Sequence, residues 1–436
     1  MPSSCSICSN VACRGGWNCG VLQILNRRKL QLLKQVEEEL ELHPLCLHFL
    51  DLSNLHLKSL PRDYFLGIGN LDSFHLDLSG NDFERLFWWT FQHLERCVKL
   101  DLHNNARLSR KVYEGLSPLR RVLRGSLNLS KCPRLDELNL GLLLNESTSW
   151  RSIDLSGCGL RKLRTRAFSR MDRLDDLDLS NNRLRSFILK PRPTLWRLDL
   201  SKNPIQYVDA AVEDLQLDSC GLNTLGGLFS SATKQRLEIL GVTNNHLTEI
   251  TCHEMAGFES LQTLGLSNNK IRRVEEGAFT QGCPVLEDLY LNDNKLTEIP
   301  ANFFKFRFIS CLLLENNLLF TIQPNAFDFT AAHSVEINLN KNPHLALKPP
   351  ASIRFTSLNG DAQAGQDALD GLFDSRTALE QYLGQLFEAQ RLLTLAKKQS
   401  IFGAFHEELI MRVLEPARME RFMETHGMEA FMEVYA

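Results

Sequence analysis

Short leucine-containing segments recur along this 436-residue chain, and they constrain its fold more than any other feature. Within residues 261–296 the same pattern occurs twice, 25 residues apart: Leu261-x-x-Leu264-x-Leu266-x-x-Asn269-x-Ile271 and Leu286-x-x-Leu289-x-Leu291-x-x-Asn294-x-Leu296. Apolar residues that alternate with period two predict a short strand with one buried face. Because so short a strand cannot bury that face alone, consecutive copies must stack and share a core.

The asparagine after each strand has a predicted structural role. Asn269 and Asn294 lie where the chain turns out of its strand. A side-chain amide at this point can bond the backbone of its own turn and that of the adjacent copy. We therefore expect stacked asparagines to satisfy backbone groups that the interior would otherwise leave without partners.

The pattern resembles the leucine-rich repeat, in the variant whose returning segment carries an Ala-Phe pair, here Gly277-Ala278-Phe279. The resemblance implies an α/β fold: a leucine-rich repeat solenoid, curved as a horseshoe, with a parallel sheet on its concave face. We expect about thirteen repeats, with turn positions at Leu55, Asn81, Asn105, Cys132, Cys158, Asn182, Asn203, Cys220, Asn245, Asn269, Asn294, Asn317 and Asn342. The resemblance also implies that the cysteines at these positions are structural.

The sequence predicts five parts. Residues 1–20 form a cysteine-containing tail, and residues 21–44 read as an amphipathic helix that caps the first edge of the solenoid. The repeats occupy residues 45–348, with shortened returning segments after Asn182 and Asn203. Residues 349–374 are predicted to be a linker. Residues 375–436 are predicted to be an all-helical extension that acts as a C-terminal cap or as a recruiting module.

Four of the twelve cysteines, Cys5, Cys8, Cys13 and Cys19, cluster in the N-terminal tail. Their spacing leaves three interpretations open: an unstructured tail with free thiols, a structural zinc site of four thiolates, or a disulfide-bonded cap. No other cofactor is expected.

Charge and hydropathy indicate the class of partner and the compartment. The net charge of −3 gives no general attraction to nucleic acid, and no apolar run approaches the length of a membrane span. The N-terminus lacks the apolar region of a signal peptide. Secreted members of the family usually end in a cysteine-rich cap near an Asn-Pro pair, whereas no cysteine follows Asn342-Pro343. We therefore expect a cytoplasmic location, with an extracellular one as the alternative.

Sequence motifs for catalysis are absent. The chain contains no GxxxxGK[ST] loop, no GxSxG and no protein-kinase signature set. Bacterial ubiquitin ligases with leucine-rich repeats carry a catalytic cysteine after the repeats, and this chain has no cysteine beyond Cys311. We therefore expect a protein that is not an enzyme.

The residue between the two core leucines of each strand is predicted to form a column on the concave face. In chain order it contains Asp51, Asp77, Asp101, Asn128, Asp154, Asp178, Asp199, Gln216, Gly241, Gly265, Tyr290, Leu313 and Asn338. Two roles remain open for these aspartates: bonding the local backbone, or forming an acidic trough for a basic segment. The candidate partner-binding residues are Asp154, Asp178, Asp199, Asp176, Asp214, Asp288, Arg197, Tyr290 and the aromatic anchor Trp196.

The predicted function is therefore non-catalytic recognition of another protein by the concave face. One alternative is an adaptor that recruits a ubiquitin-ligase scaffold through the C-terminal helices. Another is a secreted or cell-surface recognition protein.

Overall fold

The computed structural model describes residues 49–356, except for 63, 66–73, 95–96, 110–111, 117–118, 120–122, 136–148, 164–167, 169–173, 190–194, 306–308, 324, 329–333 and 346–351. The predicted cysteine tail, capping helix and C-terminal helical extension lie outside the described residues. The described chain divides into two compact units. The first comprises the residues up to Cys220 together with Leu228–Leu237, and the second comprises Gly221–Gly227 together with the residues from Glu238 onward.

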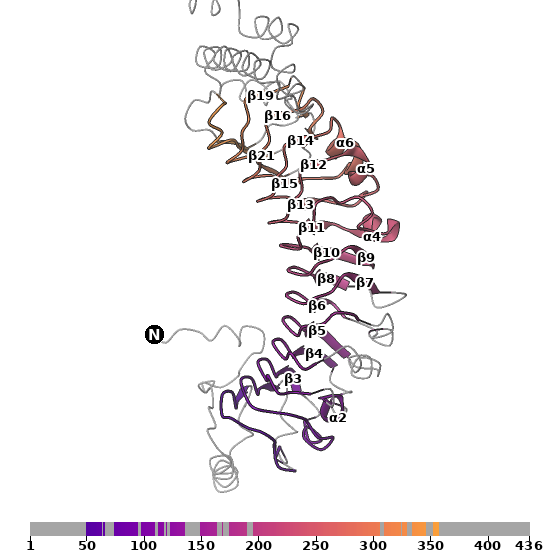
Figure 1. The fold of residues 1–436 in the computed structure, drawn as a ribbon, viewed down its shortest axis with the longest axis vertical. Coiled ribbons are helices and arrows are strands. Elements are labelled where there is room, and N and C mark those ends of the chain that lie inside the picture. The colour runs from indigo at the N-terminus through magenta and orange to yellow at the C-terminus, as the bar shows by residue number, and fades with distance from the viewer. Residues whose placement is uncertain are drawn as a thin grey trace, which may run out of the picture. The chain divides into compact units, whose positions relative to one another are not determined.

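The first unit is built on a parallel sheet in which each strand pairs with that of the next repeat (Figure 1). Its strands, in both spatial and chain order, are β1 (Phe49–Asp51), β2 (Phe74–Asp77), β3 (Cys97–Asp101), β4 (Leu123–Asn128), β5 (Ser149–Asp154), β6 (Asp176–Asp178), β8 (Leu195–Asp199) and β10 (Val212–Gln216). Chain neighbours are therefore also spatial neighbours, as expected for a solenoid.

The second unit continues the same pattern. Its sheet has the order β11 (Ile239–Gly241), β13 (Thr263–Gly265), β15 (Asp288–Tyr290), β18 (Ile309–Leu313), β21 (Ser334–Asn338) and β22 (Ser352–Thr356). The strands are parallel up to β21. Both units are therefore parallel-strand solenoids, as the leucine pattern predicts.

The leucines of the pattern form the core. Leu264, Leu266, Leu289 and Leu291 are each 0% exposed, and the register aligns Leu264 with Leu289 on the adjacent strand. Burying each such side chain contributes about 1.5–3 kcal/mol. The period-two alternation thus translates directly into a continuous column of buried leucines.

The predicted asparagine ladder is present in the described repeats. Asn269 donates through Nδ2 to the carbonyls of Val242 (2.9 Å) and Leu266 (3.0 Å), and its Oδ1 accepts from the amide of Leu247 (3.1 Å). It therefore joins its own turn to the preceding repeat. Where cysteine takes this position the thiol makes one of the same bonds, as Cys158 does by donating to the carbonyl of Leu129 (3.1 Å).

The segments that return between strands are short and contain little helix. Four helices occur in the described part: α2 (Val112–Leu116), α4 (Ser231–Arg236), α5 (Cys252–Met255) and α6 (Ala278–Gly282). Small parallel pairs fill other returns: β12 (Glu249–Ile250) with β14 (Arg273–Val274), β16 (Glu298–Ile299) with β19 (Thr321–Ile322), and β17 (Phe304–Lys305) with β20 (Phe327–Asp328). The phenylalanine of the Ala-Phe pair packs across repeats, since the rings of Phe279 and Phe303 meet edge to face at 5.4 Å.

The returns after Asn182 and Asn203, which the sequence predicts to be shortened, contain β-strands in place of helices. They form β7 (Ser186–Leu189) and β9 (Tyr207–Ala210), which pair in parallel from Ser186↔Tyr207 to Leu189↔Ala210. A strand advances further per residue than a helix does, so an extended return spans the repeat with fewer residues.

One segment inside the predicted linker differs from the expectation. Residues Ser352–Thr356 form β22, which pairs antiparallel with β21. The sequence of this segment alternates polar and apolar residues with period two, a strand pattern. Its ladder satisfies backbone groups that β21 would otherwise expose along its edge.

Among the described residues, no helix has both the length and the apolar character needed to cross a membrane.

Candidate functional site

The predicted column of polar residues is an in-register row on the sheet of the first unit. Asp154 is aligned with Asp178 on the adjacent strand, and Asp178 with Asp199 on the next. Their side chains are partly exposed, on the face opposite the buried leucines. We call this side of β5, β6, β8 and β10 the open face.

Each aspartate in the row also has a local structural role. One carboxylate oxygen accepts a hydrogen bond from the backbone amide two residues later: Ser156 to Asp154, Ser180 to Asp178 and Ser201 to Asp199, each at 2.8 Å. Asn128 makes the same bond to Ser130 at 2.9 Å, so a neutral amide can replace the carboxylate in this role. The aspartates can therefore bond the local backbone and also bind a basic segment, because the backbone bond uses only one carboxylate oxygen.

A second row on the open face contains three further candidate residues, Asp176, Arg197 and Asp214. Asp176 is aligned with Arg197, and Arg197 with Asp214. Arg197 lies 3.8 Å (Nε to Oδ2) from Asp214, whose side chain is only 9% exposed. Trp196 precedes Arg197 on β8 and is 53% exposed, whereas Leu195 and Leu198 are buried. Trp196 is therefore available to contact a partner.

The open face carries an excess of negative charge. Residues 151–156, 175–180, 196–201 and 213–218 contain eight carboxylates but only Arg151 and Arg197 as cations. Both arginines are paired within the face, since Arg151 contacts Asp175 at 3.2 Å and Arg197 contacts Asp214. Among the described residues, Asp154, Asp178 and Asp199 have no lysine or arginine within ion-pair distance. Of the two arginines, only Arg197 was predicted from the sequence, as a neighbour of the acidic column, and neither ion pair was predicted.

Two carboxylates of the open face, Asp178 and Asp176, have raised pKa values. Burial raises the pKa of Asp178, and repulsion from Asp154 and Asp199 adds to the effect, although hydrogen bonds from Ser180 oppose it. Burial likewise raises the pKa of Asp176, with repulsion from Asp175 and Asp214 and partial compensation by Arg197. A cation placed on this face would relieve the repulsion.

The raised pKa of Asp178 leads to a stability prediction. Because the folded-state pKa exceeds the unfolded value, ionised Asp178 opposes folding above the folded pKa, and this cost disappears below the unfolded pKa. We expect Asp178→Asn to be neutral or stabilising at pH 7, by about 0.2–1 kcal/mol. The gain should vanish in acid. Urea denaturation at both pH values tests this, and a clear loss of stability at neutral pH would contradict it.

The predicted residues of the second unit lie on its own sheet. Asp288 accepts through Oδ1 from the amide of Cys311 (3.1 Å), and burial raises its pKa. Tyr290 is aligned with Gly265 and Leu313, and burial together with the charge of Asp288 raises the pKa of its hydroxyl. The surrounding strand positions contain Glu238, Glu287, Glu315 and Glu336. This face is therefore acidic as well.

Four of the described cysteines are buried and held as protonated thiols. Burial raises the pKa of Cys97, Cys132 and Cys158 to about 12 and that of Cys220 to about 11. These thiols remain protonated at neutral pH and cannot act as thiolate nucleophiles. Within the described residues no group of histidine, cysteine and acidic side chains is arranged to hold a metal ion. The predicted ligands Cys5, Cys8, Cys13 and Cys19 lie outside that part of the chain.

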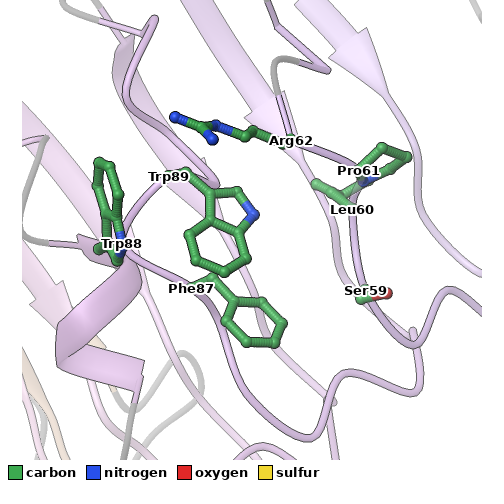
Figure 2. Close-up of a pocket in the computed structure, with 7 residues that line it drawn as sticks. All are labelled: Ser59, Leu60, Pro61, Arg62, Phe87, Trp88 and Trp89. Atoms are coloured by element: carbon green, nitrogen blue, oxygen red, sulfur yellow. The ribbon is translucent and has the colours of Figure 1, made fainter.

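The structure reveals an aromatic pocket that the sequence reasoning did not single out. It has a volume of about 350 Å³ and is lined by Ser59, Leu60, Pro61, Arg62, Phe87, Trp88 and Trp89 (Figure 2). Phe87 and Trp89 stack with ring centroids 4.4 Å apart, and Trp88 is 54% exposed. Three consecutive aromatic residues in a return segment are the signal that could have identified it. We call it the Trp88 pocket.

Comparison with known proteins gives a consistent identification. A leucine-rich repeat family model matches residues 148–208 and 235–296. Chicken Tsukushi is 26% identical over 261 residues, which is 58% of this chain and 69% of that protein. Bovine Toll-like receptor 3 is 27% identical over 301 residues, 65% of this chain and 30% of that protein. Human leucine-rich repeats and immunoglobulin-like domains protein 3 is 30% identical over 178 residues, covering 38% of this chain and 15% of that protein.

Among solved structures, the Toll–Spatzle complex from Drosophila contains a chain that matches 73% of this one, with a TM-score of 0.50 and 16% sequence identity. The match covers 45% of that chain and concerns the fold alone. The chain thus spans 15% and 30% of the lengths of two of its relatives but 69% of Tsukushi. The leucine pattern, the asparagine ladder and the match to the family model over residues 148–208 and 235–296 together show that the chain contains leucine-rich repeats.

Proposed function

We propose that this protein is a non-catalytic recognition module whose open face binds a basic segment of another protein. The observation that carries the proposal is the in-register row of Asp154, Asp178 and Asp199, which has no cationic partner among the described residues. Adjacent strands of a sheet lie about 4.8 Å apart, so these carboxylates repel one another, and Lys or Arg side chains would offset that repulsion.

Three features support a protein as the ligand. The open face runs across four consecutive parallel strands, β5, β6, β8 and β10, and so offers a row of positions along which an extended chain could bind. Trp196 offers a large exposed aromatic surface beside Arg197, and both residue types are enriched where binding energy concentrates. The Toll structure with the same fold is a complex with a second protein, Spatzle.

We further propose that recognition takes place at the cell surface or outside the cell. The support is that the relatives include a Toll-like receptor and a protein named for immunoglobulin-like domains. The buried thiols do not oppose this setting, because a pKa of about 12 keeps Cys132 and Cys158 protonated and resistant to oxidation. Thiol titration of natively produced protein tests the compartment: disulfides among Cys5, Cys8, Cys13 and Cys19 would favour it, and free or zinc-bound thiols would contradict it.

The binding proposal predicts the outcome of a peptide selection. A random peptide library displayed against the immobilised chain should yield sequences enriched in Lys and Arg, whose binding weakens as salt concentration rises. The combined variant Asp154→Asn, Asp178→Asn and Asp199→Asn should reduce their affinity at least about tenfold. Asparagine is chosen because Asn128 shows that an amide preserves the local backbone bond.

A matched control removes the same number of charges elsewhere in the first unit. The variant Asp82→Asn, Glu84→Gln and Glu114→Gln changes return segments and leaves the open face intact. It should bind the selected peptides as well as the native chain does. Equal losses of peptide affinity in the two variants would contradict the proposal, and so would a selection that yields no basic sequences.

A further inference from the structure

The Trp88 pocket combines an ordered apolar surface with unneutralised positive charge. The stacked rings of Phe87 and Trp89 face Leu60 and Pro61 from the preceding return, and the guanidinium of Arg62 lies beside them (Figure 2). Trp88 packs edge to face against Trp89, with centroids 5.7 Å apart. These contacts fix the aromatic side chains in place although Trp88 is more than half exposed.

Two arginines border this pocket without a carboxylate partner in the described part of the chain. Arg62 lines it, and the Cζ atom of Arg85 lies 4.1 Å from the ring centroid of Phe87. Nearby acidic groups are engaged elsewhere, since Glu84 contacts Arg107 (4.0 Å) and Asp82 contacts His56 (3.2 Å). The pocket is therefore complementary to a segment that presents apolar side chains next to acidic ones.

A segment of this chain with that chemistry lies just before the first strand. Residues 36–42 read Val-Glu-Glu-Glu-Leu-Glu-Leu and belong to the predicted amphipathic helix. In a helix Val36 and Leu40 lie on one side, with glutamates flanking them. The segment thus offers both properties to which the pocket is complementary, an apolar stripe and a dense negative charge.

Chain length permits this segment to reach the pocket. Glu41 precedes Phe49, the first residue of β1, by eight residues, and an extended connection of that length spans about 26 Å. Ser59, at the start of the pocket lining, follows Asp51, the last residue of β1, by the same interval. Glu41 and Ser59 are therefore joined to opposite ends of β1 by connections of equal length, and Leu40 lies one residue further from the strand.

We propose that the Trp88 pocket is the docking site of the chain's own acidic segment, residues 36–42. Val36 and Leu40 insert between the Phe87–Trp89 stack and Leu60–Pro61. The flanking glutamates pair with Arg62 and Arg85. The site is separate from the open face, so it serves to anchor the N-terminal part of the chain on the first repeats and does not bind the external partner.

A charge-reversal cycle on the full-length chain tests the proposal. The readout is acrylamide quenching of Trp88, taken as the difference between each protein and its Trp88→Phe counterpart. In the native chain Trp88 should be shielded from the quencher to a greater degree than a side chain that is 54% exposed. Reversing Glu37→Lys, Glu38→Lys and Glu39→Lys should raise the quenching constant of Trp88 severalfold. Adding Arg62→Glu and Arg85→Glu should restore the shielding.

The matched control reverses three charges at the other end of the same predicted helix: Arg27→Glu, Arg28→Glu and Lys29→Glu. It should leave Trp88 shielded. The proposal is overturned if Trp88 is quenched freely in the native chain, if the glutamate reversals change nothing, or if the arginine reversals fail to restore shielding. It is also overturned if shielding disappears on dilution, because that result would assign the pocket to a second copy of the chain.

Discussion

Replacing Asn294 by alanine should destabilise the second unit by about 3–5 kcal/mol, among the largest effects of any single polar substitution in the described repeats. The amide of Asn294 is 7% exposed. Its Nδ2 donates to the carbonyls of Leu266 (2.9 Å) and Leu291 (3.1 Å), and its Oδ1 accepts from the amide of Ile271 (3.0 Å). Alanine leaves the buried amide of Ile271 without its partner and removes one of two donors from each carbonyl, since Leu266 also accepts from Asn269 (3.0 Å) and Leu291 from Asn317 (3.0 Å).

The variant Asn294→Cys provides the comparison with Asn294→Ala. Cys132, Cys158 and Cys220 occupy the equivalent place in other repeats, and each donates to a carbonyl of the preceding repeat at 3.1–3.5 Å. Asn294→Cys should therefore lose clearly less stability than Asn294→Ala. Urea denaturation gives the size of each effect, and hydrogen exchange at the Ile271 amide locates it. If both variants lose the same amount, the ladder bonds do not have the role assigned to them.

Replacing Glu254 by alanine should give the second large loss of stability, because this one buried carboxylate accepts hydrogen bonds from two consecutive returns. Its Oε1 accepts from the hydroxyl of Thr224 and from the amide of Leu225 (3.1 Å). Its Oε2 accepts from the amide (3.0 Å) and the hydroxyl (3.1 Å) of Thr251, which closes a capping box at α5. Glu254→Ala removes four acceptor contacts and should cost about 2–4 kcal/mol.

The pH dependence of this site follows from its pKa. Burial alone would raise the pKa of Glu254, but hydrogen bonds from Thr224, Thr251 and Leu225 outweigh it and hold the pKa below its usual value. A lowered folded pKa means that the stabilisation is complete above the unfolded pKa of 4.5 and is lost as pH falls through the folded pKa. The stability difference between the native chain and Glu254→Ala should therefore shrink in acid. A difference that does not change between pH 7 and pH 3 would contradict this assignment.

The repeating elements of the fold were predictable from the sequence because they depend on local periodicity. Leu264 and Leu266 alternate within one strand, and Asn269 follows at a fixed interval, so the buried face and the ladder could be placed before the structure was known. The same spacing aligned Asp154, Asp178 and Asp199 correctly in one row. Stacking of equal repeats converts sequence period directly into spatial register.

Features that depend on contacts between side chains of different repeats were not predictable in the same way. The pairing of Arg197 with Asp214 joins residues whose separation in sequence does not specify how their side chains meet. The Glu254 network and the Trp88 pocket likewise assemble from two returns whose paths vary with their length. The antiparallel strand β22 follows the last predicted repeat, where the leucine pattern no longer gives a register.

The most direct test of the central claim is to map where a basic peptide from the selection contacts the protein. A photoreactive group on the peptide, followed by mass spectrometry of the cross-linked chain, identifies the residues within reach. We expect cross-links to the open face, around Asp176, Trp196 and Arg197, and we expect them to be lost in the variant carrying asparagine at positions 154, 178 and 199. Cross-links confined to the return segments, or left unchanged in that variant, would contradict it.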